Sequence, residues 1–369
     1  MYLKELKLKN YRNYTEQEAA FDRDINLIVG NNAQGKTNLL EAVYLLSSGK
    51  SYRTPFDREL IKWNGDTLYI RGKLIETEGE KEIEIGIKDN KKMVKVNGIP
   101  LRKRGELLGN LIVVMFSPEE IKLVKEGPGF RRRFMDQEIA QLKSSYYYAL
   151  NSYNRVLIQR NSLLKDGISE KAKMDMLCEW DRQLVEYGTK LIYERLAFIK
   201  KISAISEGVH RRITDGSEAL KVEYQSCIDL KEITGPEDIR KRLNVNLERS
   251  RKKDLMTGMT ISGPHREDIK ICINETEARK FGSQGQQRTA ALSIKLSEVE
   301  LIKEETGEYP VLLLDDVMSE LDPYRQKFVL DNLSRIQAFI TCTHLTGTVE
   351  KRYAGGKVFH INSGIITTG

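Results

Sequence analysis

The sequence lacks any long apolar run. Of its 369 residues, 31% are charged, and they interrupt every hydrophobic stretch well before the roughly 18 apolar residues that a membrane-spanning helix needs. Hydrophobic residues still make up 40% of the chain, which is too many for a disordered protein. The segment Met1–Asn10 alternates polar and apolar side chains and shows no secretory signal pattern. We therefore expect a soluble, cytoplasmic protein with no membrane partner.

Cysteine is scarce as well. The four thiols, Cys178, Cys227, Cys272 and Cys342, are widely separated, a pattern that favours neither a zinc site nor a disulfide framework. Positive charge, by contrast, is in excess, and the formal net charge is +7. This excess favours an anionic partner but leaves DNA, RNA and anionic lipid open.

Apolar periodicity divides the chain into three zones. Residues 1–125 and 256–369 are rich in predicted strands, whereas residues 126–255 are predominantly helical. The strands that we expect are Leu3–Leu8, Ile25–Val29, Leu68–Ile75, Ile83–Ile87, Met93–Val96, Leu111–Phe116, Ile269–Ile273, Val311–Leu314, Ala338–Thr343 and Lys357–Ile361. In the helical zone, apolar residues from Leu177 to Val209 recur at helical spacing but are interrupted at Gly188 and Gly208, which favours a short antiparallel bundle over an extended coiled coil. The simplest architecture is an α/β domain built from both chain ends, with a helical subdomain inserted between them.

A phosphate-loop pattern (Walker A) follows the predicted strand Ile25–Val29 and precedes a predicted helix, Asn38–Leu46. Its glycines let backbone N–H groups turn toward phosphate oxygens, and the helix start adds the positive end of a dipole. Lys36 is predicted to contact the β- and γ-phosphates, and Thr37 to bind Mg²⁺. The expected cofactor-binding residues of this loop are Gly30, Asn31, Asn32, Ala33, Gln34, Gly35, Lys36, Thr37 and Asn38.

A pair of carboxylates follows the apolar strand Val311–Leu314. A phosphate loop needs a metal-binding carboxylate at the end of a neighbouring buried strand, and Asp315 fits that place. Asp316 is then placed to polarise an attacking water. Two aspartates after a strand also fit an ordinary strand-end turn. The metal-site interpretation therefore depends on the presence of the phosphate loop in the same chain.

A second possible anion site lies at Ser283-Gln284-Gly285-Gln286, which opens the amphipathic helix predicted from Gln284 to Glu305. One nucleotide needs a single phosphate loop, so the surplus site suggests a dimer in which ATP held by one subunit also contacts the other. A plain capped helix is the alternative interpretation.

Together these motifs resemble the ABC ATPase superfamily, and within it the RecF family. The segment Ser283–Gln287 resembles the ABC signature, Asp315–Asp322 resembles the metal-binding strand end with the D-loop, and His344 resembles the switch histidine. Further segments resemble RecF-family motifs in the same order, and these are Asn10–Tyr14, Ser51–Arg53, Phe116–Glu119, Arg131–Asp136 and Gly263–Arg266. The chain departs from ABC proteins in two ways: Asp316 stands where most have glutamate, and no Q-loop glutamine is evident near Phe116–Glu120, which leaves a second metal contact unassigned.

The resemblance implies an ABC-type ATPase head that binds ATP and Mg²⁺ and dimerises on ATP. It also implies binding of single-stranded or gapped DNA and of junctions, partnership with RecR and RecO, and a nucleoid-associated role in RecA loading during repair, replication and SOS induction. The implied roles are catalysis for Asp316 and His344, metal binding for Thr37 and Asp315, proximity to the nucleotide for Arg12, and γ-phosphate contact across the dimer for Ser283, Gln284, Gly285 and Gln286.

Basic clusters are the candidates for DNA contact, and these are Arg102–Arg104, Arg131–Arg133, Arg211–Arg212 and Arg251–Lys253. The tyrosines Tyr146–Tyr148 are candidates for stacking on bases. Each cluster taken alone is more often a solvated face, and tyrosines at helical spacing usually pack against a core. Two other functions stay open: the nucleotide-binding subunit of an ABC transporter, and a non-enzymatic scaffold that uses ATP as a latch.

Overall fold

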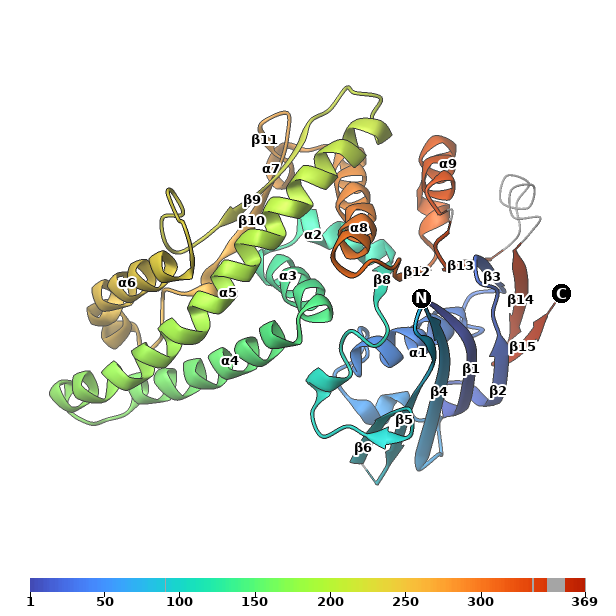
Figure 1. Cartoon of the computed structure of the whole chain (residues 1–369), viewed down its shortest axis with the longest axis horizontal. Helices are drawn as coiled ribbons and strands as arrows, with labels where there is room; N and C mark the ends of the chain where they lie inside the picture. Colours follow the sequence, from blue (N-terminus) through green and yellow to red (C-terminus); the bar gives the residue numbers. More distant parts are fainter. Residues whose placement is uncertain (90, 334, 344–355, 369) are drawn as a thin grey trace. The chain divides into compact units, whose positions relative to one another are not determined.

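The computed structural model describes residues 1–89, 91–333, 335–343 and 356–368. The chain forms two compact units: Met1–Glu120 with Glu298–Gly369, and Ile121–Ser297. Both ends of the chain thus build the first unit (Figure 1). None of the described helices is both long and apolar enough to cross a membrane.

A mostly parallel sheet forms one part of the first unit. Its strand order is β15-β14-β3-β13-β12-β8, and only the edge strand β15 runs antiparallel to its neighbour. The bounds are β3 Ile25–Val29, β8 Val113–Phe116, β12 Val311–Leu314, β13 Ala338–Cys342, β14 Lys357–Asn362 and β15 Ile365–Thr368. Strands β8 and β12 are apolar and fully buried, as expected for strands covered on both faces. Every strand of this sheet except β15 was predicted from the sequence.

An antiparallel sheet completes the first unit, in the order β2-β1-β4-β5-β6-β7. Its bounds are β1 Tyr2–Tyr11, β2 Tyr14–Ala20, β4 Thr67–Glu76, β5 Gly79–Lys88, β6 Lys91–Val96 and β7 Ile99–Pro100. Helix α1, Lys36–Ser48, packs into the same core as this sheet. Its approach is close, because a Cβ at Gly72 of β4 would lie 2.4 Å from Leu46 Cδ1. The short segments η1 Asp57–Leu60, η2 Arg104–Glu106, η3 Pro118–Ile121 and η5 Val317–Glu320 and the helix α9 Pro323–Asp331 connect these strands.

The second unit is built around a long helical hairpin. Helix α4, Ser144–Lys165, and helix α5, Glu170–Ile213, run antiparallel, as the pairs Tyr146–Arg195 and Arg160–Asp181 show (Figure 1). The remaining elements are α2 Lys122–Lys125, α3 Pro128–Leu142, β9 Leu220–Gln225, α6 Pro236–Thr257, η4 Pro264–Arg266, β10 Asp268–Ile273, β11 Thr276–Glu277, α7 Ala278–Phe281 and the beginning of α8, Gln284–Thr306.

Helix α5 differs in one respect from the sequence prediction. It runs without a break for 44 residues, through both glycines that we expected to interrupt it. Gly188 is required by packing, because a Cβ there would lie 2.8 Å from Leu243 Cδ2 of α6. Gly188 therefore marks a close approach of α6 to α5 and does not mark a helix end, whereas a Cβ at Gly208 would meet no described atom within 4 Å.

The unit boundaries also differ from those expected at residues 126 and 255. The second unit extends to Ser297 because β10 pairs with β9, so the strand predicted at Ile269–Ile273 lies in a sheet of order β11-β10-β9. Strand β9 carries only three buried or alternating apolar positions and gave a weak sequence signal. The residues of the expected signature consequently belong to the second unit, whereas the phosphate loop belongs to the first.

Candidate functional site

The phosphate loop connects β3 to α1 in a conformation that glycine makes possible. Gly35 has φ +122° and immediately precedes the first helical residue. Two side chains of the β1–β2 turn hold the loop: Tyr14 Oη donates to Gly35 O at 2.8 Å, and Asn13 Nδ2 donates to Gln34 O at 2.7 Å. These contacts preorganise a backbone whose N–H groups can face an anion.

Lys36 lies inside this loop. Its side chain is buried, and Nζ donates to Gly30 O at 2.7 Å and to Asn31 O at 3.1 Å. Both acceptors are neutral carbonyls, so a phosphate oxygen would offer the ammonium a stronger, charge-assisted hydrogen bond. The structure therefore places the predicted phosphate-binding lysine at the loop.

The two predicted metal ligands, Thr37 at the start of α1 and Asp315 directly after β12, are in contact. Thr37 Oγ1 donates to Asp315 Oδ1 at 3.0 Å, although 278 positions separate them in the chain. Burial raises the pKa of Asp315, and the neighbouring Asp316 carboxylate adds to the rise, while hydroxyls of Thr341 and Thr37 oppose it. A bound dication would favour the ionised carboxylate, and hydroxyl and carboxylate oxygens are the hard ligands that Mg²⁺ takes together with waters and phosphates. The residues thus fit a magnesium ion.

Thr341 is a residue of the site that the sequence analysis missed. It lies in β13, and its Oγ1 accepts a hydrogen bond from Asp316 N at 2.8 Å. The same oxygen lies 3.0 Å from Asp315 Oδ1 and 3.2 Å from Asp316 Oδ1. Asp316 has φ +52°, a left-handed conformation that such a contact helps to hold. A buried threonine in an apolar strand gave no signal on its own, because only the pairing of β13 with β12 brings it to the two aspartates.

Arg12 and Asn38 lie beside the loop and both have protein partners. Arg12 makes a bidentate pair with the buried Glu41 of α1, through Nη2–Oε1 at 2.7 Å and Nε–Oε2 at 2.9 Å. Burial opposes ionisation of Glu41, but hydrogen bonds from Arg12 and Ser51 outweigh it and lower the pKa of this carboxyl. Asn38 Nδ2 donates to Asn13 Oδ1 at 2.9 Å and Asn38 Oδ1 accepts from Arg53 at 2.7 Å. The RecF-like segments that contain Arg12 and Arg53 thus both contact α1, at Glu41 and Asn38 respectively. Contact between Arg12 and the nucleotide stays a prediction.

The expected signature forms a reciprocal capping box at the start of α8. Ser283 N donates to Gln286 Oε1 at 2.9 Å, and Gln286 N donates to Ser283 Oγ at 3.2 Å. Ser283, Gln284 and Gly285 are exposed. The N–H groups at the start of a helix have no intrahelical acceptor, so this helix start can receive an anion.

Two parts of the predicted site are not settled by the geometry. His344 lies outside the described residues. The segment Pro118–Ile121 forms η3 directly after β8, and a second protein contact to the metal stays unassigned there.

Most of the Arg131–Arg133 cluster holds the second unit together. Arg131 is buried and pairs with Asp268, with Nε–Oδ1 at 2.6 Å, and Arg132 donates to Glu267 O at 2.7 Å. The nearby Tyr146 is also buried, and its hydroxyl accepts from Arg195 at 2.9 Å. Stacking of Tyr146 on a base is therefore excluded in this conformation.

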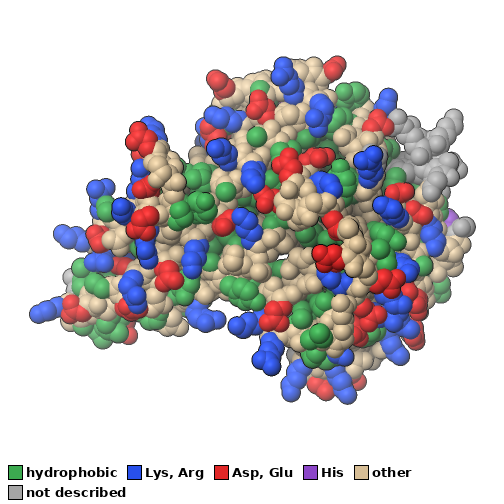
Figure 2. All heavy atoms as spheres, in the orientation of Figure 1, with side chains coloured by type: hydrophobic (Ala, Val, Ile, Leu, Met, Phe, Trp, Pro, Cys, Tyr) green, Lys and Arg blue, Asp and Glu red, His purple; other side chains and the backbone are tan. Residues whose placement is uncertain are grey.

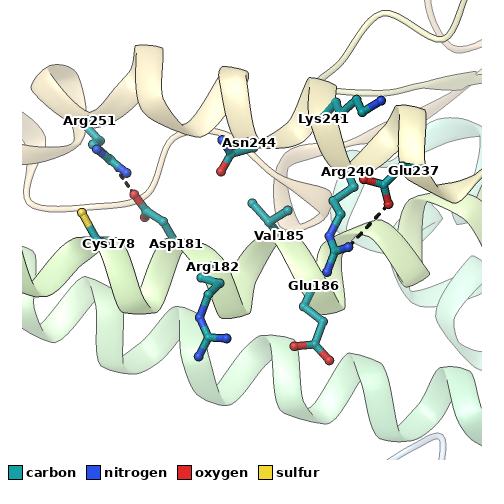
Figure 3. Close-up of a pocket in the computed structure, with 10 residues that line it drawn as sticks. All are labelled: Cys178, Asp181, Arg182, Val185, Glu186, Glu237, Arg240, Lys241, Asn244 and Arg251. Carbon is teal, nitrogen blue, oxygen red and sulfur yellow. Dashed lines mark hydrogen bonds and ion pairs between the residues drawn. The ribbon is translucent and has the colours of Figure 1, made fainter.

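A groove of about 360 Å³ lies between α5 and α6 (Figure 3). Two of its cations are paired within it, Arg251 with Asp181 at 2.7 Å and Arg240 with Glu237 at 3.4 Å. Acidic side chains lie beside the basic ones around its walls and would repel phosphate groups, so this groove does not suit a nucleotide.

Comparison with known proteins agrees with these observations. A family model described as the RecF/RecN/SMC N terminal domain matches residues 2–367. The DNA replication and repair protein RecF of Alkaliphilus oremlandii is 47% identical over 99% of this chain and 100% of its own length. The protein of the same name from Acetivibrio thermocellus is 46% identical over 93% of each chain.

Solved structures extend the similarity to the fold. A structure of the recombination mediator protein RecF-ATPrS in the RecFOR pathway superposes with a TM-score of 0.92 at 43% identity, covering 100% of this chain and 98% of the other. An Smc head domain of Pyrococcus furiosus, bound to the C-terminal domain of ScpA, has a TM-score of 0.57 at 16% identity, covers 100% of this chain and 96% of its own, and shares the fold alone. The RecF similarity runs through both compact units at high identity, and the chain therefore belongs to the RecF family.

Proposed function

We propose that this protein is an ATP-driven DNA clamp of recombinational repair. Two copies bind ATP between them, and each ATP is held by the phosphate loop of one copy and the Ser283 helix start of the other. The observation that carries this proposal is the second anion-binding helix start, whose first three residues are exposed and lie in a different compact unit from the phosphate loop. ATP then joins two subunits, and hydrolysis separates them.

The chemistry assigned to the first unit follows from its geometry. Lys36 would bind the phosphates, while Thr37 and Asp315, whose oxygens lie 3.0 Å apart, would hold Mg²⁺. Bound Mg²⁺ supplies charge stabilisation for phosphoryl transfer. Asp316 accepts the proton of an attacking water, and a carboxylate shorter than glutamate is consistent with slow turnover.

DNA contact is assigned to basic residues that remain exposed, and these are Arg102, Lys103, Arg133, Arg211, Arg212, Lys252 and Lys253. Figure 2 shows Lys and Arg side chains interspersed with Asp and Glu over the face in view. Such a surface contacts backbone phosphates without reading sequence, and its affinity falls steeply with salt. Single-stranded or gapped DNA and junctions are the substrates, RecR with RecO the partners, and RecA loading in repair, replication and SOS induction the cellular role. A solved relative that is a recombination mediator of the RecFOR pathway supports this assignment. The proposal includes association of the protein with the nucleoid.

The test is sedimentation of the protein with ATP, with ADP and without nucleotide, each with and without DNA. Wild type is expected to dimerise with ATP, and Ser283→Arg to stay monomeric because the added cation and bulk fill the helix start. Ser145→Arg is the matched control, since Ser145 is exposed on α4 of the same unit. A protein that binds ATP yet remains monomeric under every condition refutes the clamp.

A non-enzymatic latch is the second candidate. Asp316→Asn distinguishes it, because loss of the carboxylate is expected to slow both hydrolysis and dimer dissociation. If neither rate changes, Asp316 is not catalytic and the latch is favoured. The transporter-subunit alternative is disfavoured by membership of the RecF family.

A further inference from the structure

A continuous path of hydrogen bonds joins the start of α8 to the end of α5. Gln286 Nε2 donates to Glu218 Oε1 at 2.8 Å. Glu218 Oε2 lies 3.2 Å from His210 Nε2, and His210 Nδ1 lies 2.9 Å from Ser293 Oγ, which is about two turns beyond Gln286 on α8. All of these residues belong to the second compact unit.

The path ends on the capping box of the signature. The Gln286 amide is held at both of its ends, because its oxygen accepts from Ser283 N and its nitrogen donates to Glu218. The rotamer that caps Ser283 is therefore the rotamer that reaches Glu218. Without the Glu218 carboxylate, the amide could turn toward solvent and release the Ser283 backbone.

Glu218 is itself fixed in place. It precedes β9 in the turn after α5, where Thr214 N donates to His210 O at 2.9 Å and Gly216 N donates to Arg211 O at 2.8 Å. His210 is fully buried. Since an ionised carboxylate only accepts hydrogen bonds, His210 presents a proton on Nε2 to Glu218. The carboxylate is thus oriented from one side by His210 and offers its other oxygen to Gln286.

We infer that Glu218 is a positioning residue for the signature, acting through Gln286 on Ser283 and, across the dimer, on the partner's γ-phosphate. The inference rests on the proposed clamp and assigns it a residue outside the signature motif. It also connects the end of α5, through Glu218 and Gln286, to the proposed γ-phosphate contact at Ser283.

The first experiment measures ATP-driven dimerisation of Glu218→Ala by sedimentation. The variant is expected to bind ATP as a monomer like wild type but to dimerise roughly tenfold more weakly, since each signature loses a capping contact. Glu218→Gln is expected to restore dimerisation, because its amide oxygen can accept from Gln286. Its NH₂ can donate to His210 Nε2 once the neutral imidazole carries its proton on Nδ1, which faces Ser293 Oγ. Glu223→Ala is the control, as Glu223 lies on β9 in the same unit and pairs with Lys221 at the surface.

A second experiment separates positioning from folding by using tagged heterodimers. In the first pairing, Lys36→Ala is mixed with Glu218→Ala, so one composite site has an intact phosphate loop and an intact signature. In the second, the Lys36→Ala/Glu218→Ala double variant is mixed with wild type, so no composite site is intact. The first pairing is expected to hydrolyse ATP several times faster than the second, although both contain the same two substitutions.

Equal rates in the two pairings, or wild-type dimerisation by Glu218→Ala, would overturn the inference. Failure of the clamp itself gives a different result, because wild type would then show no ATP-dependent dimer and Ser283→Arg would change nothing. Dimerisation by wild type that Ser283→Arg abolishes and Glu218→Ala leaves intact would refute the role of Glu218 alone.

Discussion

Replacing Thr341 with valine removes the hydroxyl that contacts Asp315 and Asp316 while keeping the shape of the side chain. That hydroxyl accepts from Asp316 N at 2.8 Å and lies within 3.2 Å of one carboxylate oxygen each of Asp315 and Asp316. In Thr341→Val, the Asp316 amide loses its acceptor, and the two carboxylates lose the single hydroxyl proton that lies within reach of both. We expect slower ATP hydrolysis with ATP binding largely retained, because the phosphate loop is untouched.

The magnitude follows from the kind of hydrogen bond that is lost. A hydrogen bond to a charged group contributes about 1.5–3 kcal/mol. If that contribution acts on the orientation of Asp316 in the transition state, each 1.36 kcal/mol corresponds to about tenfold in rate. The kcat of Thr341→Val is therefore expected to fall roughly tenfold to a hundredfold.

Steady-state hydrolysis at saturating ATP measures this loss, and fluorescent-nucleotide titration checks that binding persists. Thr341→Ser keeps the hydroxyl and is expected to retain most of the activity. Thr367→Val, at an exposed position of β15, controls for the loss of a threonine hydroxyl elsewhere in the same sheet. A kcat for Thr341→Val within about twofold of wild type would refute this reasoning.

Three further predictions concern the loop, the second unit and the metal ligand. Gly35→Ala is expected to abolish ATP binding in calorimetry, because the residue has φ +122° and a Cβ would lie 2.7 Å from the side-chain nitrogen of Asn13. An ATP affinity within a few-fold of wild type would contradict this prediction. Arg160→Met is expected to lower the free energy of unfolding in urea by about 3–5 kcal/mol, since it leaves the buried carboxylates of Asp181 and Asp254 without the arginine that contacts each at 2.7 Å. Adding Asp254→Asn should recover part of that loss, since Asp181 still pairs with Arg251, and no recovery would argue against unpaired charge as its cause. Mg²⁺-dependent ATP binding is expected to weaken as the pH falls, and to do so at a higher pH than an ordinary aspartate would give. Burial raises the pKa of Asp315, so a proton competes with the metal for this carboxylate. An Mg²⁺ affinity that does not change between pH 4 and 7 would contradict a metal-binding role for Asp315.

The sequence alone determined the nucleotide chemistry and the class of fold. The phosphate loop, the strand before it and the helix after it are contiguous, so local backbone preferences specify the motif without long-range information. The buried strands Ile25–Val29 and Val311–Leu314 were predicted at their observed bounds, because a parallel sheet covered on both faces requires continuous apolar runs. The resemblance to the RecF family rested on such local segments and was confirmed over nearly the whole chain.

Only the tertiary structure decided which polar residues serve the site and which serve the scaffold. Thr341 joins the aspartates through strand pairing, and Glu218 reaches Gln286 from 68 positions away, so neither could be found from local spacing. Arg131 is one of three successive arginines in the sequence, yet it is buried against Asp268, and Gly188 lies inside a continuous helix because α6 packs against it. Periodicity reports whether a residue faces a core, but the partner of a charge and the reason for a glycine depend on contacts between distant parts of the chain, and those exist only once the chain has folded.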